Sequence, residues 1–159
     1  MIPIKDNDSS GKFPAITIGI ILLTIVVFGV EFFSNNLEAL IYQFALVPTL
    51  IDFSKISSLT TFISSIFLHA GFMHLLFNMW FLGIFGDNVE AVLGKIKFIL
   101  FYISGGIVAG LTQYLFLKGE SVPILGASGA IAAITVRLLK LKELKKFKVS
   151  VLAYLSVPA

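Results

Sequence analysis

The sequence contains no cysteine and few charged residues. Without cysteine, the chain can form neither a disulfide nor a thiolate–metal bond. Only 13% of its 159 residues are charged, against about 25% in an average soluble domain. Hydrophobic residues make up 57% of the chain, and the mean hydropathy is +0.98. The composition therefore indicates an integral membrane protein, and its length suits one small helical bundle.

The N-terminus does not resemble a secretory signal. Residues 1–14 carry charges of both signs, and the apolar run 15–33 that follows has no small-residue cleavage site after it. The hydrophobic region of a signal is roughly 7–15 residues long, shorter than this run. At 1.5 Å per residue the run reaches about 28 Å, enough to cross a bilayer core. We expect a cytoplasmic tail at 1–14 and a membrane domain at 15–159.

Residues 34–117 predict a loop and two more spans. Residues 34–59 are mixed in polarity, and we expect a long loop that lies in the membrane interface. Within the uncharged stretch 60–86 we expect a loop, then a helix from about His74 to Asp87. The following segment, GDNVEAVLGK, is predicted to be a connector.

A third span is expected at 98–117, where Gly106 and Gly110 have the small-xxx-small spacing that allows close helix contact. The fourth must be short, because Pro123 prevents a helix from continuing from upstream and a basic cluster begins at Arg137. The chain turns apolar again at 149–159. The prediction is an all-α membrane protein with four full transmembrane helices and the start of a fifth.

The basic residues are unevenly distributed between the predicted loops. Of the 12 basic residues, only Lys55 and Lys118 fall on the predicted outer side. Cytoplasmic loops are enriched in Lys and Arg, so we expect the N-terminus in the cytoplasm. This topology explains the pI of about 9.2 without a nucleic-acid partner. The ten residues expected inside are Lys5, Lys12, Lys95, Lys97, Arg137, Lys140, Lys142, Lys145, Lys146 and Lys148.

Two polar clusters interrupt the apolar segments, HAGFMHLLFN at 69–78 and GASGA at 126–130. His74 and Asn78 are four residues apart and would share a helix face. His69 and His74 are five apart, about 140° around a helix, and would not converge there. A helical zinc site uses histidines at i and i+4, so this spacing does not favour a metal site.

The two clusters fall at a similar predicted depth in the outer half of the bilayer. Taken alone, a serine between glycines is typical of close helix packing, and His-x-x-x-Asn is often a hydrogen-bonded core pair. Polar side chains at this depth usually face the bundle interior or a water-filled cavity and are functional candidates. The shared depth of Ser128, His74 and Asn78 favours a site.

The segments FLHAGFMHLLFNMWFLGIFGDNVE (67–90) and GASGAIAA (126–133) resemble the rhomboid family of intramembrane serine proteases, and the similarity runs from about residue 45 to 133. The resemblance implies six core spans, a membrane-embedded first loop and a short fourth helix that bears the nucleophile. It also implies a Ser–His dyad that cuts transmembrane protein substrates near the membrane surface of the lipid bilayer, without a cofactor or metal.

The resemblance implies a role for each motif residue. Ser128 matches the nucleophile, and His74 and Asn78 match the side chains that bind the oxyanion together with the Ser128 backbone N–H. Gly126 and Gly129 match motif glycines that allow close approach of helices and substrate. Preorganised oxyanion donors are each worth on the order of 10²–10³ in rate.

The chain departs from the family pattern in three places. Thr60 and Thr61 stand where the family has a Trp-Arg pair, and Val92 stands where an Arg often follows Glu90. The family's general base is a histidine on the sixth span, whereas the two histidines of this sequence both match the oxyanion side. A serine without a base is a weak nucleophile.

We therefore expect a rhomboid protease truncated in its fifth span, which is inactive as it stands and belongs to the cell membrane. The alternative is a non-catalytic protein of rhomboid-like fold that binds transmembrane helices. A transporter or channel subunit is the least favoured, since no continuous charged path is evident.

Overall fold

A computed structural model of the chain describes residues 13–141, and all the regular elements of this part are helices, as predicted. An isolated pairing of Leu46 with Ile124 is its one β-type contact within these residues. The helices are α1 (Ala15–Phe32), α2 (Leu37–Phe44), α3 (Ile56–Leu59), α4 (Thr61–Ser64), α5 (Phe72–Leu93), α6 (Lys95–Phe116) and α7 (Ser128–Leu141), with a 3₁₀ turn at Pro48–Leu50. The predicted fifth segment and the basic residues after Leu141 lie outside the described residues.

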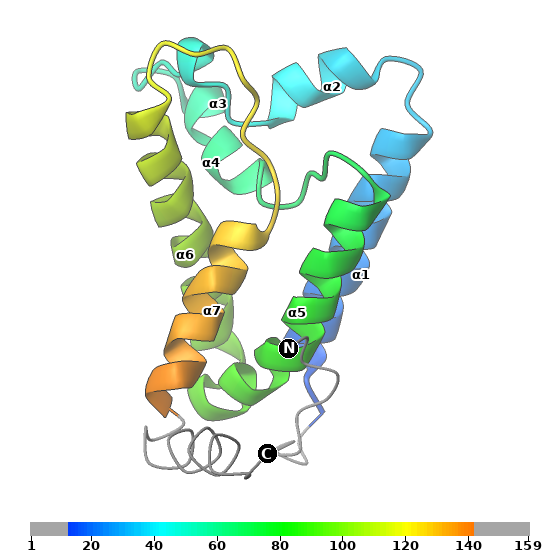
Figure 1. Cartoon of the computed structure of the whole chain (residues 1–159), viewed down its shortest axis with the longest axis vertical. Helices are drawn as coiled ribbons and strands as arrows, with labels where there is room; N and C mark the ends of the chain where they lie inside the picture. Colours follow the sequence, from blue (N-terminus) through cyan, green and yellow to red (C-terminus); the bar gives the residue numbers. More distant parts are fainter. Residues whose placement is uncertain (1–12, 142–159) are drawn as a thin grey trace, which may run out of the picture.

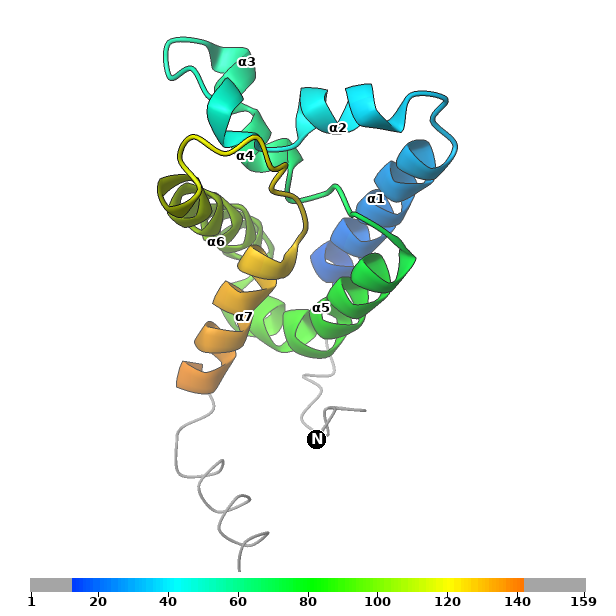
Figure 2. The ribbon, with the colours of Figure 1, turned by 45° about the horizontal axis from the view of Figure 1, so that its top comes forward.

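Four long helices, α1, α5, α6 and α7, form a bundle, and the short helices α2, α3 and α4 gather at one end of it (Figure 1). Helix α5 packs against α1 on one side and α7 on the other, and α6 packs against both α5 and α7. Figure 2 shows the same neighbours from a second direction. The bundle brings the two polar clusters of the sequence, one in α5 and one at α7, onto adjacent helices.

Helix α1 matches the predicted first span to within one residue. Pro14, the N-cap residue just before the helix, provides no capping side chain. Instead, the carboxylate of Glu90 on α5 accepts the backbone N–H groups of Ile16 at 3.0 Å and Thr17 at 2.8 Å, and the Thr17 hydroxyl at 2.8 Å. The first N–H groups of a helix have no partner inside it, so Glu90 caps α1 from another helix.

The prediction of a continuous loop at 34–59 is wrong in part, because this segment contains α2, the 3₁₀ turn and α3. Helix α2 begins after Asn36, whose Oδ1 accepts the Ala39 N–H at 3.1 Å. Asn is a favoured residue at this capping position. No residue of α2 is buried, and Figure 1 shows the helix lying across the end of the bundle.

The predicted connector after Asp87 is also wrong, because α5 continues through it to Leu93. Its polar residues Asn88 and Glu90 are buried rather than solvent-exposed. The helix ends at Gly94, where φ is +76°. Glycine adopts positive φ readily, and this turn returns the chain into α6, which begins at once with Lys95 rather than at residue 98.

Helices α6 and α7 pack closely through small residues. A β-carbon on Gly105 would lie 2.6 Å from the Ala133 Cβ, and one on Gly129 would overlap the Ala109 Cβ. Of the predicted pair, Gly106 faces both Ile66 on the chain after α4 and Ala130 of α7, and Gly110 faces Leu46 and Phe62. The predicted glycines therefore mainly accommodate the segment around α4.

Helix α7 is short, 14 residues, as the position of Pro123 predicted. The chain descends from the end of α6 through 117–127 before α7 begins, and its first turn lies level with the first turn of α5 (Figure 1). By length and composition, two described helices could cross a membrane, α1 and α6, while Ser128–Leu138 is apolar but shorter. Two of the four predicted full spans meet this standard.

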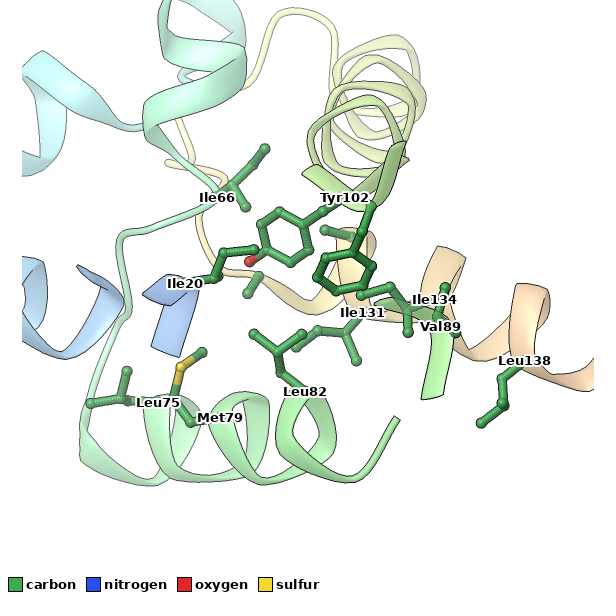
Figure 3. Close-up of a cluster of buried hydrophobic side chains, with 13 residues drawn as sticks. Ile20, Ile66, Leu75, Met79, Leu82, Val89, Tyr102, Ile131, Ile134 and Leu138 are labelled. Atoms are coloured by element: carbon green, nitrogen blue, oxygen red, sulfur yellow. The ribbon is translucent and has the colours of Figure 1, made fainter. Parts of the chain in front are cut away.

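The core lies where α1, α5, α6 and α7 meet, and Figure 3 shows its side chains pointing inward from these helices. Its largest members, Phe98 and Tyr102 of α6, are fully buried. Besides Tyr102, the members labelled in Figure 3 are Ile20, Ile66, Leu75, Met79, Leu82, Val89, Ile131, Ile134 and Leu138. This packing fixes α7 against α5 and so sets the geometry of the polar clusters.

Candidate functional site

Ser128 is the first residue of α7, and its side chain is exposed. Ala132 and Val136 are exposed as well and lie four and eight residues further along the same helix. Residues four apart share a helix face. The hydroxyl thus lies at the N-terminal end of a stripe that α5 and α6 leave uncovered within the described residues.

The turn before Ser128 is held to the first part of the chain by its backbone. The Gly126 N–H donates to the Ser65 carbonyl at 2.9 Å. Leu46 and Ile124 exchange two backbone hydrogen bonds, of 3.1 and 2.8 Å. These bonds fix the approach of the chain to α7 from two directions.

The His74 imidazole lies directly against this turn. A β-carbon built on Gly126 would be 2.7 Å from His74 Cε1 and 2.9 Å from Nε2. Gly126 also has φ of +118°, a conformation that other residues rarely adopt. Gly126 thus allows the imidazole to reach the backbone two residues before Ser128. Gly129, by contrast, serves the packing of α7 on α6.

Asn78 lies one turn after His74 on α5, on the shared face that the sequence predicted, and is 7% exposed. Its Nδ2 donates to the His74 backbone carbonyl at 2.8 Å. A carboxamide has two N–H donors, and this bond uses one. The bond fixes the orientation of the amide relative to the His74 turn of the helix.

His69 does converge with His74, contrary to the expectation for a helical segment. It lies in the turn before α5 rather than within a helix, and the two ring centroids are 5.0 Å apart with the rings at 61°. The His69 backbone N–H donates to both carboxylate oxygens of Glu31 on α1, at 3.2 Å each. Sequence reasoning did not single out Glu31, because no local pattern connects it with residue 69.

The positions that depart from the family pattern have their own local partners. The Thr60 and Thr61 hydroxyls donate to carbonyls three residues earlier, at 2.8 and 2.6 Å. Val92 is 60% exposed, while Glu90 nearby is 4% exposed and bonded to α1.

Within residues 13–141, no three His, Cys, Asp or Glu side chains are grouped as a metal site requires.

Comparison with known families assigns the chain. The Rhomboid domain family matches residues 57–157, which is more than half of the sequence and includes both polar clusters. The chain belongs to the rhomboid family. A rhomboid protein is an integral membrane protein, in agreement with the composition.

Several curated rhomboid relatives are similar to part of the chain. YdcA of Bacillus subtilis, by its name a candidate rhomboid protease, is 44% identical over 69 residues, covering 43% of this chain and 34% of that protein. The mitochondrial presenilin-associated rhomboid-like protein A of Danio rerio is 35% identical over 83 residues, covering 51% and 21%. The chloroplastic rhomboid-like protein 11 of Arabidopsis thaliana is 40% identical over 70 residues, covering 44% and 25%. The chain thus matches about a third or less of the length of these relatives.

Proposed function

We propose that this chain supplies the nucleophile and the oxyanion site of a rhomboid-type intramembrane serine endopeptidase that cleaves transmembrane proteins near the membrane surface. The observation that carries the proposal is the contact of the His74 imidazole with Gly126, two residues before Ser128. It brings a side-chain N–H donor beside the backbone turn that presents the hydroxyl. A packing serine between glycines would need no such neighbour.

In this proposal the Ser128 hydroxyl attacks the scissile carbonyl, and the negative charge that develops is bound by His74, Asn78 and the Ser128 backbone N–H. Ser128 opens the 14-residue helix α7. The unpaired N–H groups and the positive end of the helix dipole at this position favour an anion. Each preorganised donor is worth on the order of 10²–10³ in rate.

The general base must be a residue other than Ser128, His74 and Asn78. His69 and His74 are the two histidines of the sequence, and His74 is assigned to the oxyanion. We place the base-bearing segment on the exposed stripe that Ser128 shares with Ala132 and Val136. The 159 residues by themselves should not cleave, because losing the histidine of a serine protease costs on the order of 10⁶ in kcat.

The test joins this chain to the last two spans of a complete rhomboid relative, including their histidine. We expect the chimera to cleave a transmembrane reporter in proteoliposomes. Ser128→Ala should abolish cleavage and Asn78→Ala should lower kcat by on the order of 10²–10³. Ser104→Ala on α6, whose hydroxyl donates to the Phe101 carbonyl, is the matched serine control and should cleave normally.

A folded chimera that binds the reporter and never cuts it would contradict the protease proposal. That result would favour the second candidate, a rhomboid-like protein that binds transmembrane helices. Cleavage by the 159-residue chain alone would contradict the assignment of the base.

We also place the N-terminus on the cytoplasmic side of the cell membrane, on the basis of the uneven distribution of basic residues. Because the chain has no native cysteine, single cysteines report on topology directly. A cysteine at Ser34 should react with an impermeant thiol reagent added to intact cells, and cysteines at Ser9 and Lys142 should not. Labelling of a cysteine at Ser9 or Lys142 would contradict the proposed orientation.

A further inference from the structure

One buried acidic residue has no role in the site described so far. Glu31 lies near the end of α1 and is 3% exposed. A buried carboxylate is costly in a membrane protein unless it is hydrogen-bonded, and it marks a functional position more often than a packing one. The Glu31 carboxylate accepts the His69 backbone N–H with both of its oxygens.

His69 connects this carboxylate to His74. Its side chain is 3% exposed, and Nδ1 lies 3.2 Å from the Phe67 carbonyl. The edge-on contact of the His69 and His74 rings, at 5.0 Å, then borders one side of the His74 imidazole. The backbone of Gly126 borders another side.

His74 itself lies in the first turn of α5, after Gly71, which provides no capping side chain. A side chain at such a helix end can adopt rotamers that turn it away from the bundle. The ring of His69 limits that freedom only while the turn that bears it is held in place. The hydrogen bond that the His69 N–H donates to Glu31 holds this turn to α1, 38 residues earlier in the sequence.

We propose that Glu31 is a positioning residue: it fixes the His69 turn, and the His69 ring then keeps the His74 imidazole against Gly126 and the Ser128 turn. The inference deepens the proposed function and rests on it for the catalytic meaning of His74. The structural part, the dependence of the His74–Gly126 contact on Glu31, can be measured without any activity.

The structural test uses NMR of the 159-residue chain in detergent micelles. The wild type should show a nuclear Overhauser effect between His74 Hε1 and Gly126 Hα, because Cε1 lies against Gly126. Glu31→Ala should remove it, and Glu31→Gln should retain it, since the amide oxygen still accepts the His69 N–H. Thr24→Ala is the matched control. It alters a buried polar residue of α1 whose hydroxyl bonds within the helix, and it should leave the signal unchanged.

Undiminished signal in a folded Glu31→Ala variant would overturn the proposal. If that variant does not fold, a pair of changes at His69 decides instead. His69→Phe keeps an aromatic ring beside His74 and should retain the signal, whereas His69→Ala should lose it. Equal signals in these two variants would also contradict the proposal.

The catalytic consequence is measured in the chimera. Glu31→Ala should lower kcat by up to the value of one oxyanion donor, on the order of 10²–10³, with KM unchanged, and Glu31→Gln should restore it. On a His74→Ala background, Glu31→Ala should cause no further loss. A full additional loss would show that Glu31 acts through another route. An inactive parent chimera would contradict the proposed function, while the NMR result would still decide the role of Glu31.

Discussion

The imidazole of His74 lies so close to Gly126 that a β-carbon there would come within 2.7 Å of it, which leaves no room for even a methyl group. Gly126 therefore meets two demands, a positive φ and a close approach. Gly119 meets only the first, since its φ is +94° and a β-carbon there would have no neighbour within 4 Å. A comparison of Gly126 with Gly119 therefore separates the cost of the positive φ from the cost of the close contact.

Gly119→Ala should lower the free energy of unfolding by about 1–3 kcal/mol, the cost of a sparsely populated backbone conformation. Gly126→Ala should lose about 1–3 kcal/mol more, because the new methyl group overpacks the site. It should also displace His74 and remove its contact with the turn. Unfolding in mixed micelles measures the first quantity and NMR the second. Equal losses in both variants would show that the His74 contact carries no constraint.

Glu90 gives a second prediction, because it caps α1 from α5. Glu90→Ala leaves the buried Thr17 N–H and hydroxyl and the partly buried Ile16 N–H without their acceptor. Since unsatisfied buried donors cost about 1–3 kcal/mol each, we expect a loss of about 3 kcal/mol or more.

Thr17→Val removes only the hydroxyl bond and should cost about 1 kcal/mol. The exposed Glu120 is the control, and Glu120→Ala should change stability by less than about 0.5 kcal/mol. Steric-trap or denaturant unfolding distinguishes the three variants. A Glu90→Ala variant as stable as Glu120→Ala would mean that water replaces the cap.

His69 predicts a pH dependence of stability. It lies in the turn before α5, and burial lowers the pKa of its imidazole from 6.5 to about 4. Between these values the unfolded chain binds the proton more readily than the folded one, so stability is complete above pH 6.5 and falls with pH toward 4. The loss should approach about 3 kcal/mol at pH 4, from 1.36 kcal/mol per pKa unit.

Unfolding of the wild type and of His69→Phe at pH 7.5, 6 and 4.5 measures this contribution. The variant should show a smaller loss on acidification than the wild type, because it has no proton to bind at this position. Identical pH profiles would assign the acid sensitivity to the carboxylates instead.

The close packing of α6 on α7 gives the fourth prediction. A methyl group on Gly105 would meet Ala133 at 2.6 Å, whereas one on Gly29 of α1 would have no neighbour within 4 Å. Gly105→Ala should cost about 1–3 kcal/mol. Gly29→Ala should instead stabilise by up to about 1 kcal/mol, as alanine is the better helix former. Stabilisation by both would contradict the tight α6–α7 contact.

The features that the sequence predicted well are those that depend on local runs of residues. The apolar run at 15–33 became α1, and Pro123 correctly predicted that the helix after it would be short. The spacing of His74 and Asn78 placed them on one face of α5, where the amide of one bonds the backbone of the other. These properties follow from helix geometry and need no knowledge of the tertiary fold.

The errors arose where a distant contact determined the outcome. The polar residues 87–90 suggested an exposed connector, yet Glu90 is buried because α1, 73 residues earlier, presents its free N–H groups there. The five-residue spacing would separate His69 from His74 only along a helix, but α5 begins at Phe72 and the two rings converge. The bond from Glu31 joins segments 38 residues apart, and no local periodicity contains that information.

The cap on α1 also bears on how the protein is made. Ile16 and Glu90 are 74 residues apart, and a ribosome that adds about 5–20 residues per second takes roughly 4–15 s to cover that distance. During this interval the first turn of α1 has been synthesised while its final acceptor has not. The N-terminal cap of α1 can therefore form only after the end of α5 has been synthesised. The folding of the first helix is thus completed by a helix that is made much later.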